Sequence, residues 1–156
     1  MLRRLLPLLA ATALGASAQK YEGPRPPKPD LPCLKHAQNL VPMDVATARE
    51  EHKKDDVLYV IEGAAATART PLASPIFLIQ ADKLVPDKLQ LFRLTPRDGR
   101  REILFQAKKP PKPILMEVTR LGPDRVYKLE VEESLEPGEY SLSPEGSNQV
   151  FCFQVF

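Results

Sequence analysis

Few residues in this chain have the types and spacing that catalysis or metal binding requires. Cys33 and His36 form a C-x-x-H pair, whereas His52 lies among charged side chains well beyond them. Catalytic zinc normally has three protein ligands and an open position, so we expect Cys33 to be structural and predict no metal and no cofactor. The sequence has a Ser-x-x-Lys match at Ser17 and Lys20. Cleavage of the signal peptide that we predict below, after residue 18, would separate these two residues. The sequence contains no nucleophile elbow, phosphate-binding loop or zincin motif.

The carboxylates do not form a recognisable catalytic pair either. Glu130 and Glu132 share one face of a predicted strand, and Glu133 does not. A glycosidase needs two carboxyl groups that face each other across a sugar. The sequence therefore predicts that the protein is not an enzyme, with a carbohydrate-active enzyme, or its accessory domain, as the alternative. Carbohydrate-binding faces usually present exposed aromatics, but the chain has no Trp and four Tyr, of which Tyr59 and Tyr140 are expected to be structural.

The first eighteen residues have the layout of a secretory signal peptide. Two arginines precede an apolar run at 5–13, and small residues follow at 16–18. The run is shorter than the ~20 apolar residues that a membrane-spanning helix needs. We therefore predict a signal peptide at 1–18, a mature chain from Gln19 that is secreted or periplasmic, and no membrane span after signal removal.

Charge and length limit the class of the mature protein. The whole chain has 22 Lys and Arg against 20 Asp and Glu, and the leader removes two arginines and no acids. Nucleic-acid binders usually carry a basic surplus, so no nucleic-acid partner is predicted. The remaining length is enough for one domain with a core. Five prolines at 22–32 favour an extended arm, so we divide the chain into a signal peptide, a proline-rich extended arm at 19–33 and a single domain at 34–156.

From residue 57 onward the pattern indicates strands. Short apolar runs are separated by Pro, Gly and Asp, a spacing typical of a sandwich, and no long amphipathic helix lies between them. Segment 43–54 stays open, because its composition favours a short helix and its alternation favours a strand. The last run is uncharged and apolar on both faces, which predicts a central or well-covered strand. We expect strands at Val57–Ile61, Ile76–Ala81, Leu89–Leu94, Glu102–Phe105, Ile114–Thr119, Val126–Val131, Glu139–Leu142 and Val150–Phe156.

The two cysteines, Cys33 and Cys152, are a disulfide candidate. In an oxidising compartment two cysteines in one domain favour one bridge. Two separate buried thiols are the alternative, because geometry decides whether a bridge forms. If the bridge forms, Cys33 would pin the proline-rich arm to the domain.

The sharpest local pattern is Leu135-Glu-Pro-Gly-Glu-Tyr140. Pro137 and Gly138 predict a turn, and a strand follows directly with Tyr140 near its start. This pattern resembles the tyrosine corner of immunoglobulin-like and fibronectin III-like sandwiches, in which a Tyr hydroxyl bonds back to the backbone.

The resemblance implies an all-β, immunoglobulin-like antiparallel sandwich of about seven to eight strands, with room for one short helix. It makes Glu139–Ser143 the sixth strand and Val150–Phe156 the seventh. The chain departs from antibody domains because it has no Trp and because Leu142 stands where a bridging Cys would follow the tyrosine. The closing run from Pro137 to Val155 is also similar to bacterial secreted domains of no assigned function.

Together these patterns predict a secreted or periplasmic, non-catalytic binding or accessory module of the cell envelope. Its partner would be an unidentified protein or envelope component, and its oligomeric state stays open. Sandwiches commonly recognise partners through loops at one end. The candidate loops are Ala64–Ser74, Pro96–Arg101, Lys108–Pro113 and Ser143–Asn148. The candidate binding residues are basic side chains in or near these loops, and we expect charge reversal of the arginines to spare folding: Arg69, Arg97, Arg101, Lys108 and Lys109.

A small outer-membrane barrel is the third alternative, because the chain ends in Phe as many such proteins do. Barrel strands need ~9 to 11 residues with strict alternation of lipid-facing side chains. The runs here are shorter, and Gln154 stands where an apolar residue would face lipid. These observations favour the sandwich.

Overall fold

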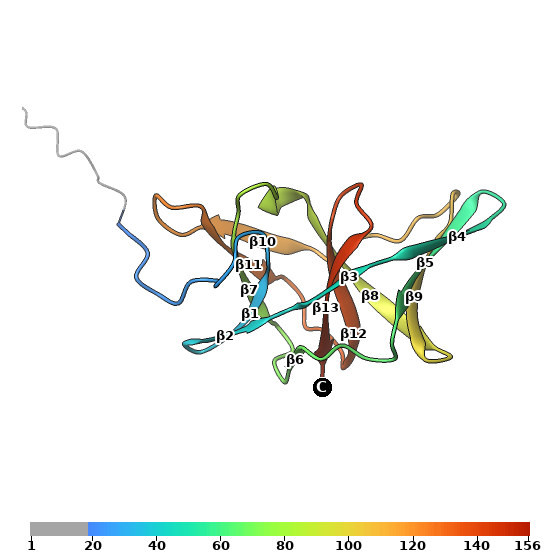
Figure 1. The fold of residues 1–156 in the computed structure, drawn as a ribbon, viewed down its shortest axis with the longest axis horizontal. Coiled ribbons are helices and arrows are strands. Elements are labelled where there is room, and N and C mark those ends of the chain that lie inside the picture. The colour runs from blue at the N-terminus through green and yellow to red at the C-terminus, as the bar shows by residue number, and fades with distance from the viewer. Residues whose placement is uncertain (1–18) are drawn as a thin grey trace, which may run out of the picture.

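The structure, a computed structural model, describes residues 19–156 (Figure 1), so the predicted signal peptide lies outside the described residues. Within this range a 3-10 turn at Pro86–Lys88 (η1) is the one helical element, and nothing in it is both helical and of the length and apolarity that a bilayer crossing requires. The strands are β1 (Cys33–His36), β2 (Asn39–Pro42), β3 (Asp44–Thr47), β4 (Arg49–Lys53), β5 (Asp56–Glu62), β6 (Arg69–Thr70), β7 (Ile76–Gln80), β8 (Leu89–Arg97), β9 (Arg100–Phe105), β10 (Met116–Arg120), β11 (Val126–Val131), β12 (Gly138–Pro144) and β13 (Gln149–Val155).

The strands form two sheets, and the all-β sandwich predicted from the sequence is confirmed. The smaller sheet has the order β10-β11-β7-β1-β2, and the larger has the order β3-β13-β12-β8-β9-β5-β4. Neighbours run antiparallel, except that β6 pairs with β13 in parallel. Segment 43–54 is strand rather than helix, because pairing of β3 with β13 and of β4 with β5 overrides its helical propensity. The described chain therefore has more strands than the seven to eight expected.

The larger sheet curls until its two edges meet. β3 and β4 lie at opposite ends of its strand order, yet only Ala48 separates them in the sequence. Because β3 pairs with β13 and β4 pairs with β5, the continuous stretch 44–53 joins both edges into a ring of strands, which we call the curled sheet. In Figure 1, β3 and β4 follow one path across the molecule. Ala48 is buried at the junction, where the chain passes from one edge to the other.

Alternation along β13 builds two cores at once. Phe151 and Phe153 point toward the smaller sheet, and the Phe153 ring lies 5.2 Å edge-on from Phe77 of β7. Val150 and Cys152 point the other way, into the curled sheet, where they belong to a second apolar cluster. β13 is therefore covered on both faces, as the composition of the final run predicted.

The proline-rich arm lies along the domain rather than projecting from it. The Asp30 carboxylate accepts hydrogen bonds of 2.8 to 3.2 Å from the backbone N–H groups of residues 82–84. Burial alone would raise the pKa of Asp30, but these hydrogen bonds outweigh it, so that the pKa lies below its usual value. Nearer the start of the arm, Arg25 forms an ion pair of 2.8 Å with Asp124. Side-chain contacts therefore hold the arm in place without a covalent link.

The corner before β12 has the hydrogen bond that the tyrosine-corner resemblance implies. The Tyr140 hydroxyl donates to the carbonyl oxygen of Glu136 at 2.7 Å, across the turn at Pro137 and Gly138. The Tyr140 ring is buried and stacks on Phe153 at 5.6 Å between centroids. Burial raises the pKa of Tyr140 above its usual value. This bond fixes where β12 begins.

The two cysteines are free thiols, so the structure does not contain the disulfide that the sequence favoured. Leu34 and Phe151 both lie in the core between the sheets, and their neighbours Cys33 and Cys152 must point away from that core in opposite directions. Burial raises the pKa of each thiol to about 11. The pairing fails because the two side chains face away from each other across the sandwich.

Candidate functional site

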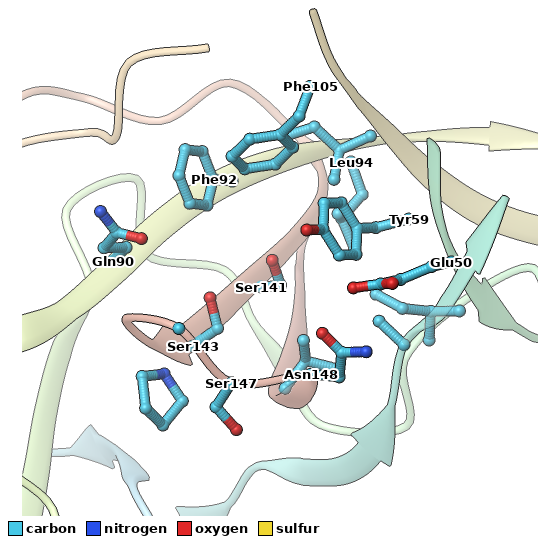
Figure 2. Close-up of a pocket in the computed structure, with 16 residues that line it drawn as sticks. Glu50, Tyr59, Gln90, Phe92, Leu94, Phe105, Ser141, Ser143, Ser147 and Asn148 are labelled. Atoms are coloured by element: carbon cyan, nitrogen blue, oxygen red, sulfur yellow. The ribbon is translucent and has the colours of Figure 1, made fainter. Parts of the chain in front are cut away.

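A cavity of about 200 Å³ opens at one end of the curled sheet (Figure 2). Its lining comes from the inward-facing side chains of β4, β5, β8, β9, β12 and β13, and from the loop between β12 and β13. The strand register explains the convergence: Tyr59 lies opposite Ile103, and Ser141 lies opposite both Phe92 and Cys152. Since paired residues share a face, all of these side chains point into the ring.

One wall of the cavity is aromatic. Tyr59 meets the ring of Phe105 at 5.0 Å between centroids, and Phe92 meets the same ring at 5.3 Å, both edge to face. Ile61 and Leu94, two members of the apolar cluster inside the curled sheet, extend this wall. Edge-to-face aromatic packing holds the three rings in fixed orientations, so this wall is formed before any ligand arrives.

The opposite side of the cavity is polar. Figure 2 shows Ser143, Ser147 and Asn148 across the space from the aromatic rings, with Ser141 between them. Ser141 is 3% exposed and lines the cavity. Hydroxyls and a carboxamide therefore face the aromatic wall across one space, and such a convergence of polar groups on an apolar concavity is typical of a binding site.

The polar side belongs to a well-anchored loop. The Ala48 N–H donates to the carbonyl oxygen of Asn148 at 2.7 Å, and the Glu145 N–H donates to that of Lys88 at 3.0 Å. Gly146 has a φ of 74°, a left-handed conformation that glycine adopts without strain. The mouth of the cavity is thus held by backbone hydrogen bonds on both sides.

The far end of the curled sheet is closed by the segment that follows β5. The Arg101 guanidinium donates to the carbonyl oxygens of Gly63 and Glu62, each at 2.9 Å. The Glu139 carboxylate accepts the Ala66 N–H at 2.6 Å and lies 3.9 Å from Arg101. Both side chains are buried. Charged groups here serve to hold a chain segment across the ring, and the cavity occupies the other end.

The charge of the cavity is slightly negative. Among its lining residues in the described chain, Glu50 is the charged side chain. Glu50 lies at the rim, where one carboxylate oxygen is 3.2 Å from the Nε2 of His52. With no Lys, Arg or His in the lining, the cavity offers no counter-charge to an anion.

The candidate binding residues from the sequence lie away from this cavity. Arg69 donates to the Gln154 side chain at 2.7 Å, and its guanidinium lies 4.2 Å over the Phe156 ring. Lys108 and Lys109 are exposed in the segment that follows β9. None of the three lines the cavity.

The prediction that Arg101 is a binding residue in an exposed loop is wrong. Arg101 is 5% exposed, lies in β9 opposite Ile61, and points into the curled sheet. Arg97, by contrast, ends β8 on the surface and approaches the buried Glu102 carboxylate at 3.3 Å. The two arginines stand on either side of one tight hairpin, but β9 turns only Arg101 inward.

Of the four candidate loops, Ser143–Asn148 does line the cavity. Sequence reasoning missed the rest of the site. Ser141, for example, alternates with apolar residues as it would on a solvent face. The signal that marks it is the strand after β12, which is apolar on both faces, because the neighbour of such a strand is also covered on both faces.

The C-x-x-H pair does not form a metal site. The Cys33 thiol donates to the carbonyl oxygen of Leu31 at 3.7 Å, while the His36 Nε2 is 2.9 Å from the Thr70 hydroxyl. Within residues 19–156, no group of three or more His, Cys, Asp or Glu side chains is placed to hold a metal ion. Comparison with known protein families, with curated proteins and with solved structures gave no match.

Proposed function

We propose that the protein is an exported, non-catalytic binding module of the cell envelope and that it binds through the cavity of the curled sheet. The observation that carries this proposal is a cavity of about 200 Å³ with a fixed aromatic wall and, across from it, the polar side chains of Ser141, Ser143 and Asn148. Small-molecule sites are typically apolar concavities with a few polar groups that converge on one space. The cavity of this protein has that composition.

Non-catalytic action is favoured by the chemistry of the lining. Glu50 is the one carboxylate among the cavity residues of the described chain, and its neighbour His52, 3.2 Å away, lies outside the lining. Glycoside hydrolysis uses two carboxyl groups, and nucleophilic catalysis uses a nucleophile beside a base. The lining supplies groups that hold a ligand, without such a pair.

The export part of the proposal rests on the signal-peptide layout of residues 1–18 in the sequence. The Tyr140 hydrogen bond supports the immunoglobulin-like assignment of the C-terminal strands. The export proposal is tested by expressing the full chain in a secreting bacterium and measuring the mass of the released protein. We expect a mature protein that begins at Gln19; a product that keeps the leader and stays in the cell would refute export.

The binding proposal is tested by filling the cavity. Ser143→Phe places a ring at the inward-facing edge of the cavity, and Ser134→Phe makes the same change at an exposed loop position as the matched control. Small fragments are titrated while backbone amide shifts are followed by NMR. We expect at least one fragment to shift the amides of residues 143–148 in the wild type and in Ser134→Phe, but not in Ser143→Phe. Equal binding by all three proteins would place the site elsewhere.

A further inference from the structure

We propose that the cavity binds one uncharged, polyhydroxylated ring, that is, a single sugar unit, either free or at the end of a glycan. This inference rests on the proposed function, since it names the ligand class of the same site. The tests below separate failure of the ligand class from failure of the site.

The polar groups of the cavity are of the kind that recognise hydroxyls. Tyr59, Ser141 and Ser143 supply side-chain hydroxyls, and Gln90 and Asn148 supply carboxamides. Hydroxyls and carboxamides each both donate and accept hydrogen bonds, as sugar hydroxyls do. All five side chains line the cavity, where their polar groups can meet a ligand.

These polar groups surround the space instead of clustering at one point. In Figure 2, Gln90 lies on one side of the cavity, Asn148 lies on another, and Ser141 and Ser143 lie between them. Tyr59 comes from β5, across the ring from β12. A ligand that satisfies groups in so many directions must carry polar atoms around its whole edge, as a pyranose ring does.

The aromatic wall of the cavity suits the apolar face of a sugar ring. A pyranose has an apolar face of C–H groups that packs against aromatic side chains. Phe92, Phe105 and Tyr59 form a fixed aromatic surface on one side of the cavity. The chain has no Trp, but a concave cavity needs fewer large aromatics than a flat binding face, because several walls contribute contact.

The volume and the charge of the cavity restrict the class of ligand further. The cavity of about 200 Å³ lies between a dry cavity of ~150 Å³ that holds benzene and the ~300 Å³ at which drug-sized sites begin. One six-membered ring with substituents fits this range. Glu50, the charged side chain of the lining, repels anions. An acidic sugar or a phosphorylated one is therefore excluded from the proposed class.

The first test titrates the mature protein with six small probes that each contain one six-membered ring. The sugars are methyl α-glucopyranoside, methyl β-galactopyranoside and N-acetylglucosamine, and the other probes are benzyl alcohol, phenethylammonium and benzoate. We expect one of the sugars to shift the amides of residues 143–148 with a Kd of about 1 mM, the range for about 13 to 15 non-hydrogen atoms at ordinary ligand efficiency. We expect benzoate not to bind.

The outcomes separate the two proposals. If benzyl alcohol or phenethylammonium shifts these amides and no sugar does, the sugar inference is overturned while the binding site stands. If none of the six probes shifts them, both proposals fall. Free and glycan-bound sources are compared with a reducing monosaccharide and a short oligosaccharide that ends in the same unit. Tighter binding of the oligosaccharide assigns the glycan end, and equal or weaker binding assigns the free sugar.

The second test removes one hydroxyl from the lining. Tyr59→Phe keeps the aromatic wall and deletes its polar group, and Tyr127→Phe on β11 is the matched control outside the cavity. We expect Tyr59→Phe to weaken sugar binding about fivefold or more, to leave benzyl alcohol binding unchanged if that probe binds, and Tyr127→Phe to change neither. An unchanged sugar affinity in Tyr59→Phe would contradict the proposed pose.

Discussion

Reversing the charge of Arg101 is the change that most directly tests the closed end of the curled sheet. Its guanidinium is buried, donates to the carbonyl oxygens of Glu62 and Gly63, and lies 3.9 Å from the Glu139 carboxylate. In Arg101→Glu both carbonyl oxygens lose their donor, and a second carboxylate is placed beside the buried Glu139 carboxylate. The variant therefore combines a broken charge pair with like-charge repulsion.

The expected cost follows from the burial of this pair. Removing one partner of a buried ion pair typically costs ~3–5 kcal/mol, because the other charge is left without compensation. The whole stability of a domain is ~5–15 kcal/mol. For a domain of this size, ~3 °C of melting temperature corresponds to each kcal/mol, so we expect Arg101→Glu to melt roughly 10–15 °C below the wild type.

The assay is urea unfolding followed by far-ultraviolet circular dichroism, with thermal melting as a second measurement. Lys109→Glu is the matched control, because it makes the same charge change at an exposed position. We expect the control to stay within ~0.5 kcal/mol of the wild type. If Arg101→Glu unfolds at the same urea concentration as Lys109→Glu, the closed end does not depend on this arginine and the reasoning is refuted.

Three further predictions concern the corner, the arm and the thiols. Tyr140→Phe removes the hydroxyl that donates to Glu136, and we expect a loss of ~1–2 kcal/mol in urea unfolding; no change would mean that the corner bond is dispensable. The pKa of Asp30 is lowered in the folded state, so its contribution to stability is present above the unfolded pKa and is lost as the pH falls through the lower folded value. Between pH 6 and pH 2 the free energy of unfolding should fall less steeply in Asp30→Asn than in the wild type. If the two proteins lose stability in parallel, the Asp30 hydrogen bonds do not stabilise the arm. Cys33 and Cys152 should resist alkylation at pH 8 in the folded protein, because burial raises both pKa values to about 11, and thiol counting in denaturant without reductant should give two; a count of zero would show a disulfide.

The sequence predicts the parts of the fold that are set by local pattern. The dipeptide Asp98-Gly99 between two apolar runs is a hairpin signal that can be read from the sequence, and in the turn between β8 and β9 both residues have positive φ, as a two-residue type I′ hairpin requires. The apolar run 57–61 lies in β5, because a run of β-branched and aromatic residues fits a covered strand. The all-β class follows from many such signals that agree with one another.

The closure of the curled sheet could not be predicted, because it depends on which distant strands pair. Nothing local to Ala48 indicates that the residues before it pair with β13 and those after it with β5. The inward direction of Arg101 depends on the same closure. Since the cavity exists only where the ring closes, Ser141 could not be recognised as part of its lining, although it lies within a predicted strand.

The central position of β13 constrains the order in which the polypeptide can acquire its structure. This strand pairs with β12, β3 and β6, and it supplies side chains to both apolar clusters. Residues 44–47 and 69–70 therefore lack their partner strand while residues 149–155 are still being synthesised. Contacts over such long sequence separations slow acquisition of the native state. Because β13 is made after all three of its partner strands, the two sheets can lock together only once residues 149–155 are available to pair.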